Sequence, residues 1–104
     1  MIHPDGAVHR AFERGLRVAL LAAPEKQRKR ILTACDRVNQ ETDPARQCVL
    51  VLEGVQACLE GLRLSPLRNS PECREAKKAL NIASKALELW REMQNLERVD
   101  PRSN

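Results

Sequence analysis

The chain is poor in aromatic side chains: Phe12 and Trp90 are the only two among its 104 residues, and tyrosine is absent. A β-sandwich is rich in aromatic and β-branched residues, and proteins that bind single-stranded nucleic acid stack bases on aromatic rings. The scarcity therefore argues against both classes. It favours a protein made of helices that pack through leucine, alanine, valine and isoleucine.

Residue patterns that carry chemistry are also missing. The only histidines, His3 and His9, lie near the start, and no two of the four cysteines have the CxxC spacing of a zinc site. The sequence contains no Ser/His/Asp arrangement, glycine-rich phosphate loop or helix-borne metal motif. Acidic residues are interspersed with lysine and arginine at the spacing of solvated helix faces. We therefore expect no enzyme activity, no metal and no cofactor.

Long apolar runs are absent as well. The run from Val18 to Ala23 is too short to span a bilayer, and the first 14 residues lack the apolar segment of a signal peptide. These patterns predict no membrane association. The expected location is cytoplasmic, or nuclear in a host that has a nucleus.

The strongest positive signal is a long helix from Ser70 to about Arg98. Ser70 can act as N-cap, Pro71 suits the first helical position, and no further proline or glycine follows before Pro101. One apolar track has the alternating three- and four-residue spacing of a coiled-coil or bundle seam. It comprises Ala79, Ile82, Ala86, Leu89, Met93 and Leu96. A second track beside it widens the stripe and comprises Ala76, Leu80, Ala83, Leu87 and Trp90.

Three shorter helices are expected before it, over about 7–22, 25–40 and 44–62, with Asp43-Pro44 repeating the Ser70-Pro71 start signal. Leu21 in the first helix and Leu32 in the second are expected to face inward. Four helices with short connections predict an all-α antiparallel four-helix bundle with a long C-terminal helix. We expect a single domain over 1–104, with flexible ends at about 1–5 and 100–104.

Small residues indicate where these helices approach one another. Gly15, in the middle of the first helix, predicts a close helix contact. Gly54, Cys58 and Gly61 form a small-residue seam along one side of the third helix. We expect this seam to receive the alanine-rich first half of the long helix.

The last turns of the long helix are the first candidate interaction surface. The helix is longer than the other three, so its end is expected to overhang the bundle and expose apolar side chains. Alternatively, the N-terminal segment folds back over them. Trp90 is either a core anchor or an interface residue, and core placement is favoured. The predicted apolar partner-binding residues are Trp90, Met93, Leu96 and Val99.

A basic edge of the first helix hairpin is the second candidate surface, in a chain of net charge +4. Its residues are Arg10, Arg14, Arg17, Lys26, Arg28, Lys29 and Arg30. The simplest interpretation is a solvated, highly charged corner. The functional alternatives are a docking patch for an acidic protein surface, a phosphate-binding edge and a nuclear-import signal.

The cysteines leave one further alternative open. Three of the four lie inside helices and are expected to behave as small buried apolar residues, whereas Cys73, near a helix N-terminus, is the one candidate for a reactive thiol.

Together these patterns predict a small non-enzymatic adaptor or regulatory domain that binds another protein. Self-association as a homodimer through the C-terminal helix is a version of the same hypothesis. The alternative is a nucleic-acid-associated accessory protein that contacts phosphates through the basic edge. A third possibility is a redox sensor that works by cysteine pairing.

Overall fold

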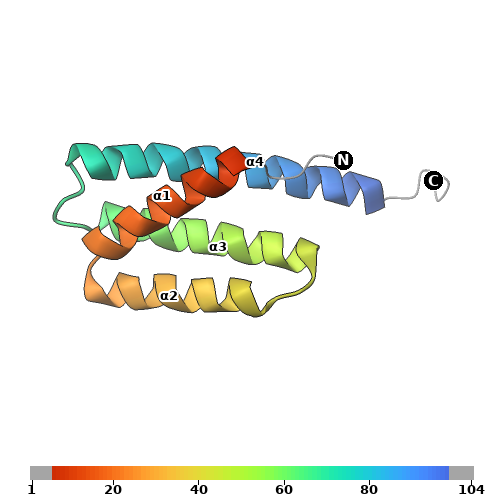
Figure 1. Ribbon diagram of the computed structural model, residues 1–104, viewed down its shortest axis with the longest axis horizontal. Coiled ribbons are helices and arrows are strands. Elements are labelled where there is room, and N and C mark those ends of the chain that lie inside the picture. The colour runs from red at the N-terminus through yellow and green to blue at the C-terminus, as the bar shows by residue number, and fades with distance from the viewer. Residues whose placement is uncertain (1–5, 99–104) are drawn as a thin grey trace.

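The computed structural model describes residues 6–98, which form four helices: α1 (Gly6–Ala22), α2 (Glu25–Gln40), α3 (Pro44–Arg63) and α4 (Pro71–Arg98). Consecutive helices run antiparallel, and α4 is the longest at 28 residues (Figure 1). The predicted fold class, an all-α bundle with a long C-terminal helix, is confirmed. Every helix boundary lies within a residue of its expected position.

Local signals at the helix starts explain these boundaries. Ser70 caps α4 as expected, because its Oγ accepts a hydrogen bond from the backbone N–H of Cys73 at 3.2 Å. Asp43 occupies the N-cap position of α3, but its side chain makes no capping bond. In this turn the side chain of Glu41 accepts the Asp43 N–H at 3.2 Å, and the Gln47 amide donates to the carbonyl of Val38 at 3.3 Å.

The four helices are not equivalent in the bundle. α1, α3 and α4 pack against one another, whereas α2 lies along α3 and makes no close approach to α4. Figure 1 shows α1 crossing α4 obliquely, while α2 and α3 run side by side. The core therefore lies between α1, α3 and α4, and α2 closes its other side through the fully buried Ile31.

Small residues set two of the helix contacts. A Cβ on Gly15 would lie 2.6 Å from Cδ2 of the buried Leu80, so the predicted close contact at Gly15 is confirmed. A Cβ on Gly61 would lie 2.9 Å from Cβ of Ala23 and 3.3 Å from Cδ1 of Ile31. The prediction that the Gly54–Gly61 seam receives α4 is therefore wrong. This seam receives α2 and the turn that precedes it.

Only one of the two apolar tracks of α4 is buried in the core. The polar Ser84 is buried. The buried apolar residues are those of the second track, extended at its start by Cys73: Cys73, Ala76, Leu80, Ala83, Leu87 and Trp90. The first track does not face the core, because Ile82 and Leu89 are exposed. The next position on the buried track is the polar Gln94, so α4 has no apolar residue there with which to continue its packing. Figure 1 shows the end of α4 extending beyond the other helices.

Two leucines that were expected to face inward are instead exposed. Leu21, at the end of α1, and Leu32, in α2, both present their side chains to solvent. Each lies one residue beyond a position that is at least partly buried, Leu20 and Ile31 respectively. At each pair the core contacts the first of the two neighbouring positions, fully at Ile31 and in part at Leu20.

Candidate interaction surface

The exposed apolar track of α4 is the most regular surface feature of the described residues. Ile82, Leu89 and Leu96 are seven residues apart, and their exposed fractions are 63%, 57% and 72%. A seven-residue repeat keeps side chains on one side of a helix over several turns. The partly buried Ala79, Ala86 and Met93 lie between them. We call these six residues the outer stripe: Ala79, Ile82, Ala86, Leu89, Met93 and Leu96.

The geometry of α4 explains why the bundle leaves the outer stripe uncovered. Each of the first four residues of the stripe is followed directly by a residue of the buried track, as in Ile82–Ala83 and Leu89–Trp90. Adjacent residues on a helix point about 100° apart. The outer stripe therefore lies roughly a quarter turn away from the face that contacts α1 and α3.

Charged side chains border the outer stripe on the side away from the bundle. Lys78, Lys85 and Glu92 are all exposed and again lie seven residues apart. In heptad terms they occupy the flanking positions of a seam formed by the outer stripe. Charges at such positions govern which helix can pair with the seam and in which orientation.

Trp90 belongs to the core, as its favoured placement predicted. Only 8% of it is exposed, and it forms a buried cluster with Cys48 and Leu52 of α3 and with Leu87. Of the other predicted apolar partner-binding residues, Met93 is partly buried and Leu96 is exposed. Val99 lies outside the described residues. Trp90 therefore anchors the base of the overhang and offers little of its own surface to a partner.

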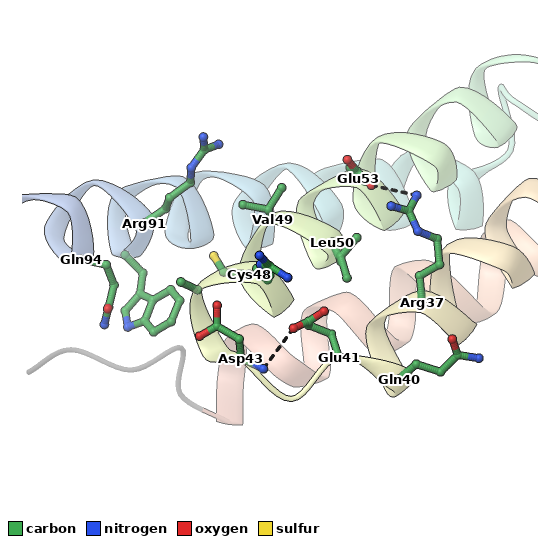
Figure 2. Close-up of a pocket in the computed structure, with 13 residues that line it drawn as sticks. Arg37, Gln40, Glu41, Asp43, Cys48, Val49, Leu50, Glu53, Arg91 and Gln94 are labelled. Atoms are coloured by element: carbon green, nitrogen blue, oxygen red, sulfur yellow. Dashed lines mark hydrogen bonds and ion pairs between the residues drawn. The ribbon is translucent and has the colours of Figure 1, made fainter. Parts of the chain in front are cut away.

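A hollow of about 940 Å³ lies beside this cluster, between the α2–α3 turn, the start of α3 and the end of α4. Figure 2 shows the ion pair between Arg37 and Glu53, 3.3 Å apart, at one end of the hollow and Arg91 and Gln94 of α4 at the other. The Nε1–H of Trp90, which also lines the hollow, is buried and has no hydrogen-bond partner in the described part of the chain. Sequence reasoning missed this hollow because three segments far apart in the chain contribute to it.

The charged lining of the hollow has both signs. Three arginines and three carboxylates contribute: Arg37, Arg46, Arg91, Glu41, Asp43 and Glu53. A site for a strongly charged ligand concentrates one sign of charge, and this lining does not. The hollow is thus a polar recess between helix ends and does not resemble a dedicated ligand site.

All seven residues of the predicted basic edge are exposed. Arg14 lines a small hollow with Glu72 and Glu75 at the start of α4. Arg30 lines another hollow with Glu60 of α3. The pKa of the Glu60 carboxyl is held below its usual range, chiefly by the hydrogen bond from Arg63 and also by the charge of Arg30. Two of the predicted basic residues thus lie beside carboxylates of different helices.

The four cysteines are free thiols, and Cys48, Cys58 and Cys73 are buried. Burial raises the pKa of the Cys58 thiol to about 12, and the neighbouring Cys35 adds to this rise. Cys73 lies near the start of α4 but is only 1% exposed. The expectation of small buried apolar residues is confirmed for Cys48 and Cys58, whereas Cys35 is only partly buried. Cys73, the candidate reactive thiol, is buried as well.

No protein-family model, curated protein or solved structure that was compared with the chain matches it significantly. Among the described residues, no group of three or more histidine, cysteine, aspartate or glutamate side chains is placed to hold a metal ion. None of the four helices, within residues 6–98, has the length and apolar character needed to cross a membrane.

Proposed function

We propose that this protein is a small, non-enzymatic adaptor or regulatory domain that binds another protein through the outer stripe of α4. The observation that carries the proposal is the exposure of Ile82, Leu89 and Leu96 at regular seven-residue intervals. Burying a leucine or isoleucine side chain stabilises a complex by about 1.5–3 kcal/mol. Three such side chains aligned on one face favour association with an apolar partner surface.

The packing of α4 supports this use of the stripe. From Cys73 to Trp90 the helix is held against α1 and α3 by its buried track. The stripe is therefore presented on a preformed helix, which lowers the entropy lost on binding. The matching partner surface is a hydrophobic groove or a second amphipathic helix, because either accepts side chains at helical spacing.

A binding experiment with matched variants tests the proposal. The tagged protein is cross-linked in extracts of its own source, and captured proteins are identified by mass spectrometry. Leu89→Gln together with Leu96→Gln is expected to abolish the capture of the specific partner. Leu21→Gln is the control, because Leu21 is also an exposed helical leucine but lies on α1, outside the stripe. Capture that survives the double substitution unchanged contradicts the proposal.

A second candidate function is contact with nucleic-acid phosphates through the basic residues. Its support is the exposure of Lys26, Arg28 and Lys29 in the first turns of α2. Such binding releases counterions and weakens steeply as salt rises. Fluorescence anisotropy with a labelled duplex tests it: Arg28→Glu with Lys29→Glu should remove the signal. Binding that is absent at low salt contradicts it.

A further inference from the structure

The outer stripe alternates small and large side chains. In size, it is complementary to the outer stripe of a second copy that runs in the opposite direction. Consider two copies of α4 packed antiparallel about a two-fold axis that passes between residues 87 and 88. The facing pairs are then Ala79 with Leu96, Ala86 with Leu89, and Ile82 with Met93, each occurring twice. Every alanine meets a leucine of the second copy. Such alternation of small and large residues lets facing layers interdigitate without voids.

The flanking charges fit the same arrangement. In an antiparallel pair of helices, the flank that carries Lys78, Lys85 and Glu92 faces the same flank of the second copy. In the register above, Lys85 of one copy lies beside Glu92 of the other, and the two-fold axis repeats this contact. Both side chains are exposed in the single chain and free of the bundle. The pairing therefore places two opposite-charge contacts around the apolar seam.

The parallel alternative fits poorly. It would set Ala79 against Ala79 and Ala86 against Ala86, which leaves voids in two of the layers. In a parallel pair, Lys85 of one copy would lie beside Trp90 of the other. Trp90 is buried in its own bundle and carries no charge. Side-chain size and charge thus both select the antiparallel orientation.

We infer that the occupant of the outer stripe is a second copy of this chain, joined through an antiparallel α4–α4 pair. This inference rests on the proposed function, since it assigns the partner of the same stripe. The pairing also gives a role to the end of α4 that extends beyond the other helices. Met93 and Leu96, which follow the last residue of the buried track, contact Ile82 and Ala79 of the second copy. A single short helix pair forms a small interface, and such interfaces are characteristically reversible.

Sedimentation equilibrium of the purified full-length protein over a range of concentrations tests the inference first. The wild type should fit a monomer–dimer equilibrium. Leu89→Lys should weaken the dimer by about 100-fold or more, because it places two unpaired cations in the apolar seam. Leu21→Lys, at an exposed leucine outside the stripe, should leave it unchanged. Circular dichroism confirms that both variants are folded. A wild type that stays monomeric, or a dimer that Leu89→Lys leaves intact, overturns the inference.

Charge exchange tests the antiparallel register. Lys85→Glu alone and Glu92→Lys alone each place like charges in contact twice and should each weaken the homodimer about tenfold. The double variant with both substitutions restores both pairs and should recover the wild-type affinity. A mixture of the two single variants should form the heterodimer in preference to either homodimer. Equal affinities across this set overturn the register.

The two proposals fail in different ways. A monomeric wild type refutes self-pairing. The stripe could then still bind a different protein, and the capture experiment decides that question. Capture that is unaffected by the Leu89 and Leu96 substitutions refutes the proposed function itself.

Discussion

Gly15 of α1 lies directly against the fully buried side chain of Leu80 of α4. A methyl group at Gly15 would fall 2.6 Å from Cδ2 of Leu80, well inside van der Waals contact. The absence of a side chain at Gly15 therefore sets how closely α1 crosses α4. Because this contact lies within the core shared by α1, α3 and α4, Leu80 has little room in which to move away.

Gly15→Ala should accordingly destabilise the protein, although alanine is the better helix former. Overpacking a core typically costs about 1–3 kcal/mol, and the gain in helix propensity offsets about 1 kcal/mol of that. Gly54→Ala is the matched control: its Cβ would meet Ala34 at an ordinary 3.9 Å, so it should raise stability by up to about 1 kcal/mol. Urea unfolding of both variants measures the difference. Equal effects of the two substitutions would contradict the close contact.

The two N-caps provide a second paired prediction. Ser70→Ala removes the hydrogen bond that Oγ accepts from the Cys73 N–H and should cost about 1 kcal/mol. Asp43→Ala removes no capping bond, because the Asp43 side chain makes none, and it should cost clearly less. Thermal and urea unfolding report both values. If Asp43→Ala proves the more damaging, the described α2–α3 turn is incorrect.

The helix boundaries could be predicted because their signals are local. Pro24, Pro44 and Pro71 each stand at or next to the start of a helix, and these signals need no knowledge of the tertiary fold. The prediction of which face of each helix is buried depended on periodicity alone. Existence, order and length of the helices therefore followed from the sequence.

The choice of buried face could not be predicted in α4. Its two apolar tracks are offset by one residue and are similarly apolar, so periodicity favours neither. The outcome depends on α1 and α3: Leu80 fits against Gly15, and Leu87 and Trp90 fit against Cys48 and Leu52. For the same reason, the Gly54–Gly61 seam was assigned to the wrong neighbour. Which helix meets which small-residue seam is a non-local property of the packing.

Trp90 should contribute strongly to stability, since it is the largest side chain in the cluster at the far end of the bundle. Trp90→Ala should cost about 3–5 kcal/mol. Trp90→Phe keeps an aromatic ring in the cluster. It removes part of the ring volume together with an N–H that has no hydrogen-bond partner among the described residues, so its cost should be less than half as large. Chemical unfolding followed by circular dichroism measures both. A phenylalanine variant as unstable as the alanine variant would contradict the interpretation that apolar ring contacts account for most of the contribution of Trp90.

Cys58 should make the protein less stable at alkaline pH. Its pKa is raised from an ordinary 9.0 to about 12 by burial, with a further contribution from Cys35. Below pH 9 the thiol keeps its proton in both states, so it has no effect on the pH dependence of folding. Between these two pKa values the unfolded chain loses the proton and the folded chain retains it. The free energy of unfolding therefore falls as pH rises, by about 1.4 kcal/mol per pH unit for this group.

The Cys58→Ala variant isolates this contribution, because all other titrating groups are common to both proteins. The variant should be less stable than the wild type at neutral pH, owing to the lost side-chain volume. Its disadvantage should shrink by about 2 kcal/mol between pH 8 and about pH 10.5. Urea unfolding under reducing conditions at several pH values measures the difference. Stability curves that stay parallel over this range would show that the Cys58 thiol ionises as readily in the folded protein as in the unfolded chain, which contradicts its burial between α2 and α3.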